Sequence, residues 1–170
     1  MVLTIGKSHV CTSGYIFDGD TLNMNYEGQQ FRCRLQWIDC PESQKAGRTS
    51  EQPLILKHWE LAEKAKTELF RMVDGKKIVV IPLEKDIYDR WICDLYADAV
   101  KVSANIQIAL CKMGLAVPYF PQYRWKFSSR ELAILRGIIT ETARADRAKS
   151  GIWSVPDFIL PHSFKKITTF

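Results

Sequence analysis

The chain has 170 residues, of which 46% are hydrophobic, and this length and composition suit one folded domain with a substantial core. Lys and Arg number 24 against 19 Asp and Glu, and the resulting formal net charge of +5 favours polyanionic partners. No segment has the apolar length of a signal-peptide core or of a helix that crosses a bilayer, so neither is predicted.

Strands are predicted in the first half of the chain. Residues 15–26 and 30–38 read as two strands, and the turn signal Glu27-Gly28 between them indicates a hairpin. Two further runs of β-branched and aromatic residues, 77–83 and 91–97, predict another pair of strands.

Helices are predicted between and after these strands. Apolar residues recur at helical spacing over 57–73, after a polar stretch at 43–52 that has neither period. A short helix is predicted over 106–113, before Gly114. A longer one is predicted from Ser128 to about residue 149, because Ser128 and Glu131 fit a capping box. The order of the elements by itself indicates only an α+β protein.

Cysteine usage bears on the compartment. The five cysteines contain no Cys-x-x-Cys pair, so a zinc site is not predicted: Cys11, Cys33, Cys40, Cys93 and Cys111. An odd number without a disulfide pattern favours a reducing compartment such as the cytoplasm. A chain whose export signal had been removed would instead be a secreted protein, so both localisations stay open.

Three short segments carry charged side chains next to apolar, strand-like residues: Asp18-Gly19-Asp20-Thr21, Arg34-Leu35-Gln36-Trp37-Ile38-Asp39-Cys40-Pro41-Glu42 and Tyr88-Asp89-Arg90. Taken singly, they could be a turn, a strand end at a proline, and solvated strand arginines. Taken together they offer several carboxylates and two arginines. Carboxylates bind hard cations, and guanidinium groups bind phosphate through paired hydrogen bonds. The combination therefore indicates metal-assisted cleavage of a phosphodiester.

In this order the three segments resemble the staphylococcal nuclease (thermonuclease) family, whose pattern is Asp-Gly-Asp-Thr, Arg-Leu, Asp-x-Pro-Glu and Tyr-x-Arg. Further marks are Gly114-Leu115-Ala116 and Gly151-Ile152-Trp153. The resemblance covers residues 16–153 and leaves 154–170 as a C-terminal tail. It implies an α+β fold, a five-stranded OB-fold β-barrel with three packed α-helices, in a single nuclease domain over residues 1–170.

The resemblance also implies a metal site. Asp20 and Asp39 match the direct ligands, together with the main-chain oxygen of Cys40, and Asp18 matches an outer-shell carboxylate that acts through bound water. The best-known relative has threonine in place of Cys40, but a main-chain carbonyl does not depend on the side chain. An oxygen-only ligand set suits Ca²⁺, with Mg²⁺ as a possible substitute that needs stricter octahedral geometry.

The same resemblance assigns catalytic roles. Arg34 and Arg90 match the pair that holds the scissile phosphate, and Glu42 matches the carboxylate that orients or deprotonates the attacking water. Tyr88 matches a tyrosine that contacts a terminal phosphate of the substrate, and a second substrate tyrosine falls near Tyr119.

The chain departs from the family at one substrate contact. Ile87 stands where the best-known relative has a phosphate-binding lysine, and Lys45 or Arg48 in the 43–52 stretch could supply a replacement. Residues 117–126 interleave aromatic and basic side chains, which suits either stacking on nucleic-acid bases or packing of a loop onto the barrel.

The predicted function is therefore a calcium-dependent nuclease that acts on DNA and RNA, with a preference for single strands. By resemblance it cleaves the P–O5′ bond and leaves 3′-phosphate ends. The alternative is a non-catalytic OB-fold module that binds nucleic acid. A protein-interaction scaffold would leave the charged segments unexplained.

Overall fold

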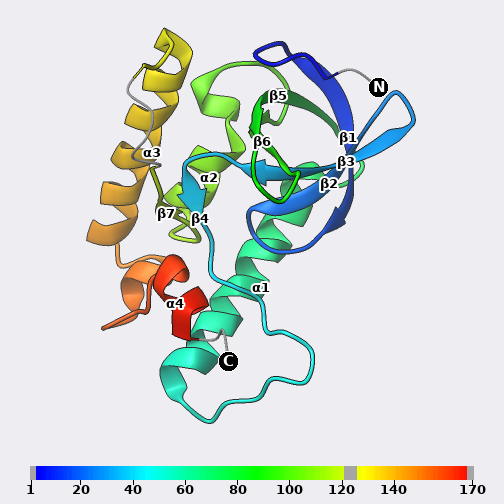
Figure 1. Ribbon diagram of the computed structural model, residues 1–170. Helices are drawn as coiled ribbons and strands as arrows, with labels where there is room; N and C mark the ends of the chain where they lie inside the picture. Colours follow the sequence, from blue (N-terminus) through cyan, green and yellow to red (C-terminus); the bar gives the residue numbers. More distant parts are fainter. Residues whose placement is uncertain (1–2, 121–125, 168–170) are drawn as a thin grey trace.

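Five strands close into a barrel in the computed structural model, which describes residues 3–120 and 126–167 (Figure 1). The strand order is β1-β2-β3-β6-β5, and every neighbouring pair is antiparallel except β3 and β6, which run parallel. The strands are β1 (His9–Ile16), β2 (Thr21–Tyr26), β3 (Gln29–Leu35), β5 (Lys77–Lys85) and β6 (Trp91–Tyr96). This closed barrel with helices packed on it confirms the α+β fold expected for an OB-type protein.

The hairpin between β2 and β3 follows the sequence prediction. Glu27 and Gly28 both have positive φ angles, 49° and 76°, and Tyr26 pairs with Gln29 across the turn. Two successive positive φ angles match the two-residue turn that joins twisted antiparallel strands. The predicted strand over 15–26 is divided, however, because the chain turns between Ile16 and Thr21.

The three predicted helices are present, and the bounds of the first differ most. α1 (Pro53–Val73) begins four residues before the predicted start, with proline in its first turn, where a missing N–H costs least. α2 (Ile106–Lys112) is capped by Asn105, whose side chain accepts a hydrogen bond from the Ile108 N–H. α3 (Ser129–Arg147) has the complete predicted capping box between Ser128 and Glu131.

Short elements complete the described chain. β4 (Ile38–Asp39) pairs with β7 (Val117–Pro118), and a fourth helix, α4 (Pro161–Ile167), forms in the C-terminal tail. Two 3₁₀ turns, η1 (Val102–Ala104) and η2 (Gly151–Ser154), precede α2 and follow α3. Figure 1 shows α4 in red beside β4 and the first half of α1.

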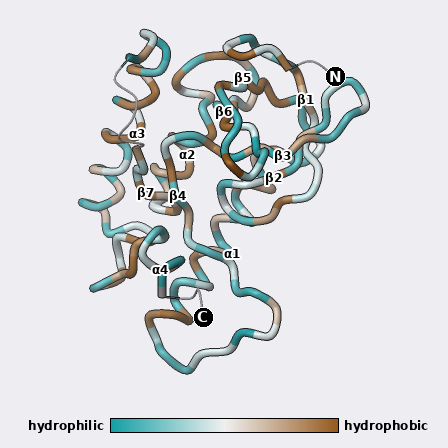
Figure 2. The backbone as a smooth tube through the Cα atoms, in the orientation of Figure 1, coloured by the Kyte–Doolittle hydropathy of each residue, from teal (hydrophilic) through white to brown (hydrophobic). Residues whose placement is uncertain are grey.

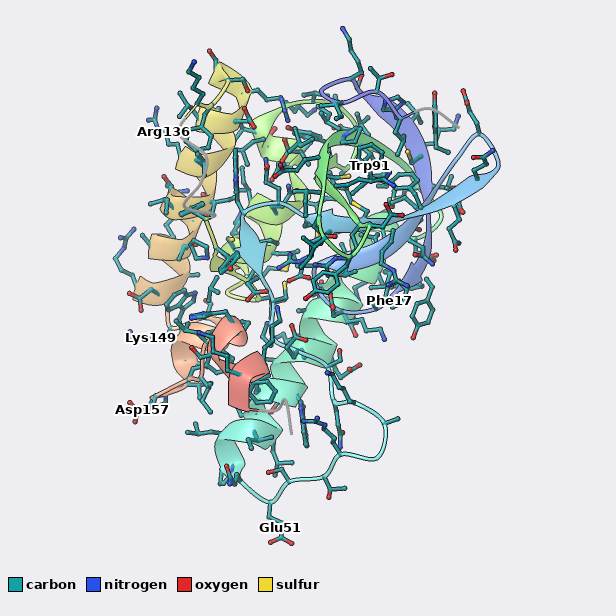
Figure 3. All side chains as sticks on the ribbon, in the orientation of Figure 1. Phe17, Glu51, Trp91, Arg136, Lys149 and Asp157 are labelled. Carbon is teal, nitrogen blue, oxygen red and sulfur yellow. The ribbon has the colours of Figure 1, made fainter. Side chains whose placement is uncertain are left out.

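One hydrophobic cluster joins the barrel interior to the inner faces of α1, α2 and α3. All five cysteines are buried in the structure, and none forms a disulfide. The connection between β4 and α1 is largely hydrophilic in Figure 2, and Arg136 and Lys149 lie on the side of α3 away from the barrel in Figure 3. In the described part of the chain, no helix combines the length and apolar character needed to cross a membrane.

Candidate active site

The turn between β1 and β2 carries the first two acidic residues. The Asp20 N–H donates a hydrogen bond to Asp18 Oδ1 at 3.0 Å, which fixes the turn. Gly19 packs so closely that an added Cβ would lie 2.6 Å from the Ala65 Cβ on α1 and 2.9 Å from the Cys40 Cβ. A glycine is therefore needed to bring this acidic turn against α1 and the end of β4.

Arg34, at the end of β3, joins the acidic residues of two separate segments. Its Nη1 lies 3.1 Å from Asp20 Oδ2 and its Nη2 donates to Asp39 Oδ1 at 2.8 Å. Asp20 Oδ2 also accepts a hydrogen bond from the Cys40 N–H at 2.7 Å. Arg34, Asp20 and Asp39 are 9%, 4% and 2% exposed, so this ion cluster is almost entirely removed from water.

The pKa values reflect crowded carboxylates. Burial, and then the charge of Asp20, raise the pKa of Asp18 to about 8. Burial and Asp20 also raise the pKa of Asp39, although Arg34 and Lys165 oppose this effect. Burial would lower the pKa of Arg34, but the surrounding carboxylates raise it overall. The positive charge of Arg34 is therefore not enough to balance the carboxylates of this cluster.

The donor chemistry of this cluster fits the expected divalent cation. The carboxylates of Asp18, Asp20 and Asp39 and the main-chain oxygen of Cys40 form an oxygen-only set, and Asp39 Oδ2 accepts no hydrogen bond from the described residues. In their present positions, the His, Cys, Asp and Glu side chains of the described segments form no group of three or more around one point. Arg34 and Lys165 are the cations that contact these acids.

A cavity of about 700 Å³ opens beside the cluster. Its lining includes Arg34 and Asp39 from the ion cluster, Arg90 directly before β6 and Tyr119 directly after β7. Because β3 and β6 pair in parallel, with Cys33 opposite Trp91, Arg34 in β3 and Arg90 directly before β6 belong to neighbouring segments. The cavity thus brings together both arginines expected to hold phosphate.

Arg90 is held at the cavity by a tight turn. Its Nε and Nη2 both contact Asp86 Oδ2 at 2.7 Å, and Asp89 takes a positive φ of 60° to make the turn. Burial would raise the pKa of Asp86, but hydrogen bonds from Arg90 and from the Tyr88 N–H lower it overall. None of the described hydrogen bonds uses Arg90 Nη1.

The two expected substrate tyrosines lie apart. Tyr119 lines the cavity and is half exposed, whereas Tyr88 lines a separate surface depression with Arg32 and Lys85. Tyr88 still contacts the site indirectly, because the Arg90 Cζ lies 5.3 Å from the centre of its ring. The aromatic and basic residues 121–125 lie outside the described part of the chain.

Glu42 lines a second, smaller pocket of about 200 Å³ together with Lys45 and Arg48, the two basic residues suggested as replacement phosphate contacts. Its main-chain N–H donates to His58 Nε2 of α1 at 2.8 Å. Burial lowers the pKa of His58 to about 4, so the ring is neutral near pH 7 and can accept this hydrogen bond.

Sequence reasoning did not find the contribution of α4. The Lys165 Nζ contacts Asp39 Oδ1 and Glu42 Oε1, each at 2.9 Å, and Lys165 lines both pockets. His162 and Lys166 of α4 also line the larger cavity. The only sequence signal was the basic and aromatic character of the tail, which does not reveal where the tail packs.

The closed five-stranded barrel with its packed helices places the chain among the OB-type α+β proteins, and an arginine–carboxylate cluster lies at the edge of this barrel. The chain belongs to the staphylococcal nuclease homologue family, whose model matches residues 32–155. The match includes Arg34, Asp39, Glu42 and Arg90. The acidic turn before β2 and the helix α4 lie outside it.

Individual relatives are more distant. The chain is 28% identical over 153 residues to the Probable endonuclease LCL3 of Kluyveromyces lactis, a match covering 87% of this chain and 52% of that protein. It is 26% identical to Protein ParB of Escherichia coli, covering 89% and 76% of the two chains. An uncharacterized protein of Bacillus anthracis is also 26% identical, with 85% and 61% covered. The chain thus spans only about half to three quarters of the length of these relatives.

Proposed function

We propose that this chain is a single-domain, calcium-dependent nuclease, over residues 1–170, that hydrolyses phosphodiester bonds of DNA and RNA. The observation that carries the proposal is the convergence of Arg34, Arg90 and the buried Asp39 on one cavity. Family membership and the endonuclease named among the relatives support a nuclease-type activity.

The metal site is proposed at Asp20, Asp39 and the Cys40 carbonyl, with Asp18 in the outer shell. Ca²⁺ would neutralise this excess of carboxylates and polarise the substrate phosphate, and Mg²⁺ is a possible substitute. Burial and Asp20 raise the pKa of Asp18, and a bound divalent cation would lower that pKa and favour the ionised carboxylate.

The two arginines are proposed to bind the substrate phosphate, and Glu42 is proposed to accept a proton. Arg90 offers Nη1 to a phosphate oxygen in the cavity, and Arg34 binds the same phosphate when its guanidinium exchanges part of its carboxylate contacts. Negative charge increases on the phosphate oxygens in the transition state, so these donors lower the barrier. Glu42 takes the proton of the attacking water.

Substrate preference follows from the same surface. Tyr119 supplies an exposed ring at the cavity on which a base of a single strand can stack, and Tyr88 reaches the strand from the other side of Arg90. Cleavage of the P–O5′ bond with 3′-phosphate products is proposed from the family resemblance.

A non-catalytic nucleic-acid-binding module is the second candidate. It is favoured by one observation: Arg34 and Lys165 already contact the carboxylates that a metal would need. In that case the cationic cavity would bind the strand without cutting it.

Cleavage of a single-stranded DNA oligonucleotide, and of its RNA counterpart, distinguishes the two candidates. Wild-type protein and the variant Arg90→Ala are incubated with Ca²⁺, Mg²⁺ or EDTA, and the ends of the products are analysed. The nuclease is supported by cleavage that requires metal, leaves 3′-phosphates and is lost in the variant. Binding without cleavage under any metal would establish the module.

A further inference from the structure

Lys165 lies at the centre of the candidate site, although it belongs to a helix outside the family match. Its Nζ donates a hydrogen bond to Asp39 Oδ1 and forms an ion pair with Glu42 Oε1, both at 2.9 Å. We infer that Lys165 is a positioning residue that holds the Glu42 carboxylate beside Asp39, at the edge of the phosphate-binding cavity. This inference rests on the proposed nuclease function.

Without a cation between them, Glu42 and Asp39 would repel each other. Asp39 is 2% exposed, so water screens its charge poorly and the repulsion is stronger than between surface acids. Of the two pockets at the site, Glu42 lines the smaller and Asp39 lines the larger, whereas Lys165 lines both. Lys165 is therefore the connection between the proposed proton acceptor and the phosphate-binding cavity.

The packing of α4 fixes where the lysine can reach. Phe164, the residue before Lys165, is 2% exposed, and its ring stacks on that of His58 with 3.6 Å between the ring centres. Phe158 stacks parallel to the same imidazole at 5.2 Å. Because His58 Nε2 accepts the Glu42 N–H, the C-terminal tail supports Glu42 at its main chain through His58 and at its side chain through Lys165.

The opposite interpretation is that Lys165 blocks the site by occupying the metal-binding carboxylates. The contacts of Lys165 favour positioning, because they use one oxygen of each carboxylate, Asp39 Oδ1 and Glu42 Oε1. The second carboxylate oxygens, Asp39 Oδ2 and Glu42 Oε2, accept no hydrogen bond from the described residues. Oxygen ligands thus remain for a cation while Lys165 is bound.

The first test is steady-state kinetics on the single-stranded oligonucleotide with Lys165→Met, Lys165→Arg and, as a control, Lys101→Met. Lys101 is also an exposed lysine in an ion pair, with Asp98, but lines none of the cavities at the site. We expect Lys165→Met to lower kcat about 10- to 100-fold with little change in KM, because a displaced catalytic group slows the chemical step. Lys165→Arg should restore most of this loss, and the control should match the wild type.

A double-mutant cycle tests whether the effect passes through Glu42. If Lys165 positions Glu42, Lys165→Met has no further effect on kcat once Glu42→Gln is present. An equal fold-loss in both backgrounds would overturn the inference. So would higher activity of Lys165→Met than of the wild type, which would identify α4 as a block.

The same cycle on the melting temperature in metal-free buffer needs no activity. The shifts caused by Lys165→Met and Glu42→Gln should be non-additive if the two side chains contact each other, and additive shifts would contradict the inference even in an active enzyme. A wild-type protein that cleaves nothing under any metal would instead contradict the proposed nuclease, while this cycle still decides on the contact.

Discussion

Arg34 and Arg90 differ in how deeply they are buried, and this difference separates their expected effects. Arg34 is enclosed by Asp20 and Asp39, whereas Arg90 is half-buried and pairs with one acid, Asp86. A lysine at position 34 can satisfy one buried carboxylate but not both, because it lacks the planar fork of the guanidinium.

We therefore predict that Arg34→Lys and Arg90→Lys both lower kcat by about 10²–10³, the usual cost of losing one charge-stabilising donor. Only Arg34→Lys should also lower the free energy of unfolding, by about 1–3 kcal/mol, because a buried hydrogen bond to a carboxylate is lost. Steady-state kinetics measures the loss of kcat, and urea unfolding measures the loss of stability. Near-full turnover of Arg90→Lys would exclude the two-arginine clamp.

His58 gives the site a predicted pH dependence of stability. Its folded-state pKa, about 4, lies below the ordinary value near 6.5, so at intermediate pH the unfolded chain binds a proton that the folded protein does not. Neutral His58 therefore contributes about 3 kcal/mol to the free energy of unfolding above pH 6.5. This contribution is lost as the pH falls from 6.5 toward 4.

The measurement is urea unfolding of the wild type and His58→Gln between pH 7 and 4. The glutamine can still accept the Glu42 N–H, but it does not titrate. The wild type should lose more stability than the variant across this interval. Parallel curves would show that His58 does not titrate as expected.

At the scale of elements, two glycine motifs that are distant in the sequence meet in one contact. The Ile152 N–H donates to the Gly114 carbonyl at 2.8 Å, which joins the end of α2 to η2. Gly114 has a φ of +68°, and a Cβ there would lie 2.1 Å from the Ser150 carbonyl oxygen. Both the conformation and the space therefore require glycine.

We predict that Gly114→Ala lowers the free energy of unfolding by about 2–4 kcal/mol, from positive-φ strain together with the displaced backbone. Gly28→Ala is a suitable control, because Gly28 also has a positive φ but an added Cβ there would meet nothing within 4 Å. Chemical unfolding of both variants measures the difference. Equal losses would mean that the tight contact contributes nothing beyond φ strain.

Elements with strong local signals were predictable, and those that depend on long-range packing were not. The capping box at Ser128 and the turn at Glu27-Gly28 are local, and both are confirmed. The sequence did not predict the part of β1 from His9 to Gly14, because HVCTSG has too few apolar residues to show an alternating pattern. This part of the strand is instead determined by its pairing with β5. α4 is only seven residues long and depends on Phe164 packing against His58.

At the scale of the whole molecule, the motif order was enough to bring most of the candidate site together. Arg34, Asp39 and Arg90 could be grouped because each lies in a recognisable motif next to a strand of the barrel. Lys165 could not, because its contact with Asp39 joins residues 126 positions apart through a segment that the family pattern does not include.

The charge distribution supports a final prediction. The chain carries a formal charge of +5, yet Asp20 and Asp39 share contacts with Arg34, and Lys165 joins Asp39 to Glu42. Within the described segments, these two cations are the ones that contact the three acids. Such local repulsion lowers the stability of the metal-free protein, and a divalent cation that binds only the folded state removes it.

We therefore expect Ca²⁺ to raise the melting temperature. At 100 times its dissociation constant, a ligand adds about 2.7 kcal/mol, which corresponds to roughly 5–10 °C for a protein of this size. Differential scanning calorimetry across a calcium titration to millimolar levels, with NaCl at matched ionic strength, measures the shift. Asp20→Asn should reduce the shift, because one of the two proposed direct carboxylate ligands is lost. A wild-type melting temperature that stays constant throughout would exclude calcium at this cluster and leave the barrel as a metal-free binder of nucleic acid.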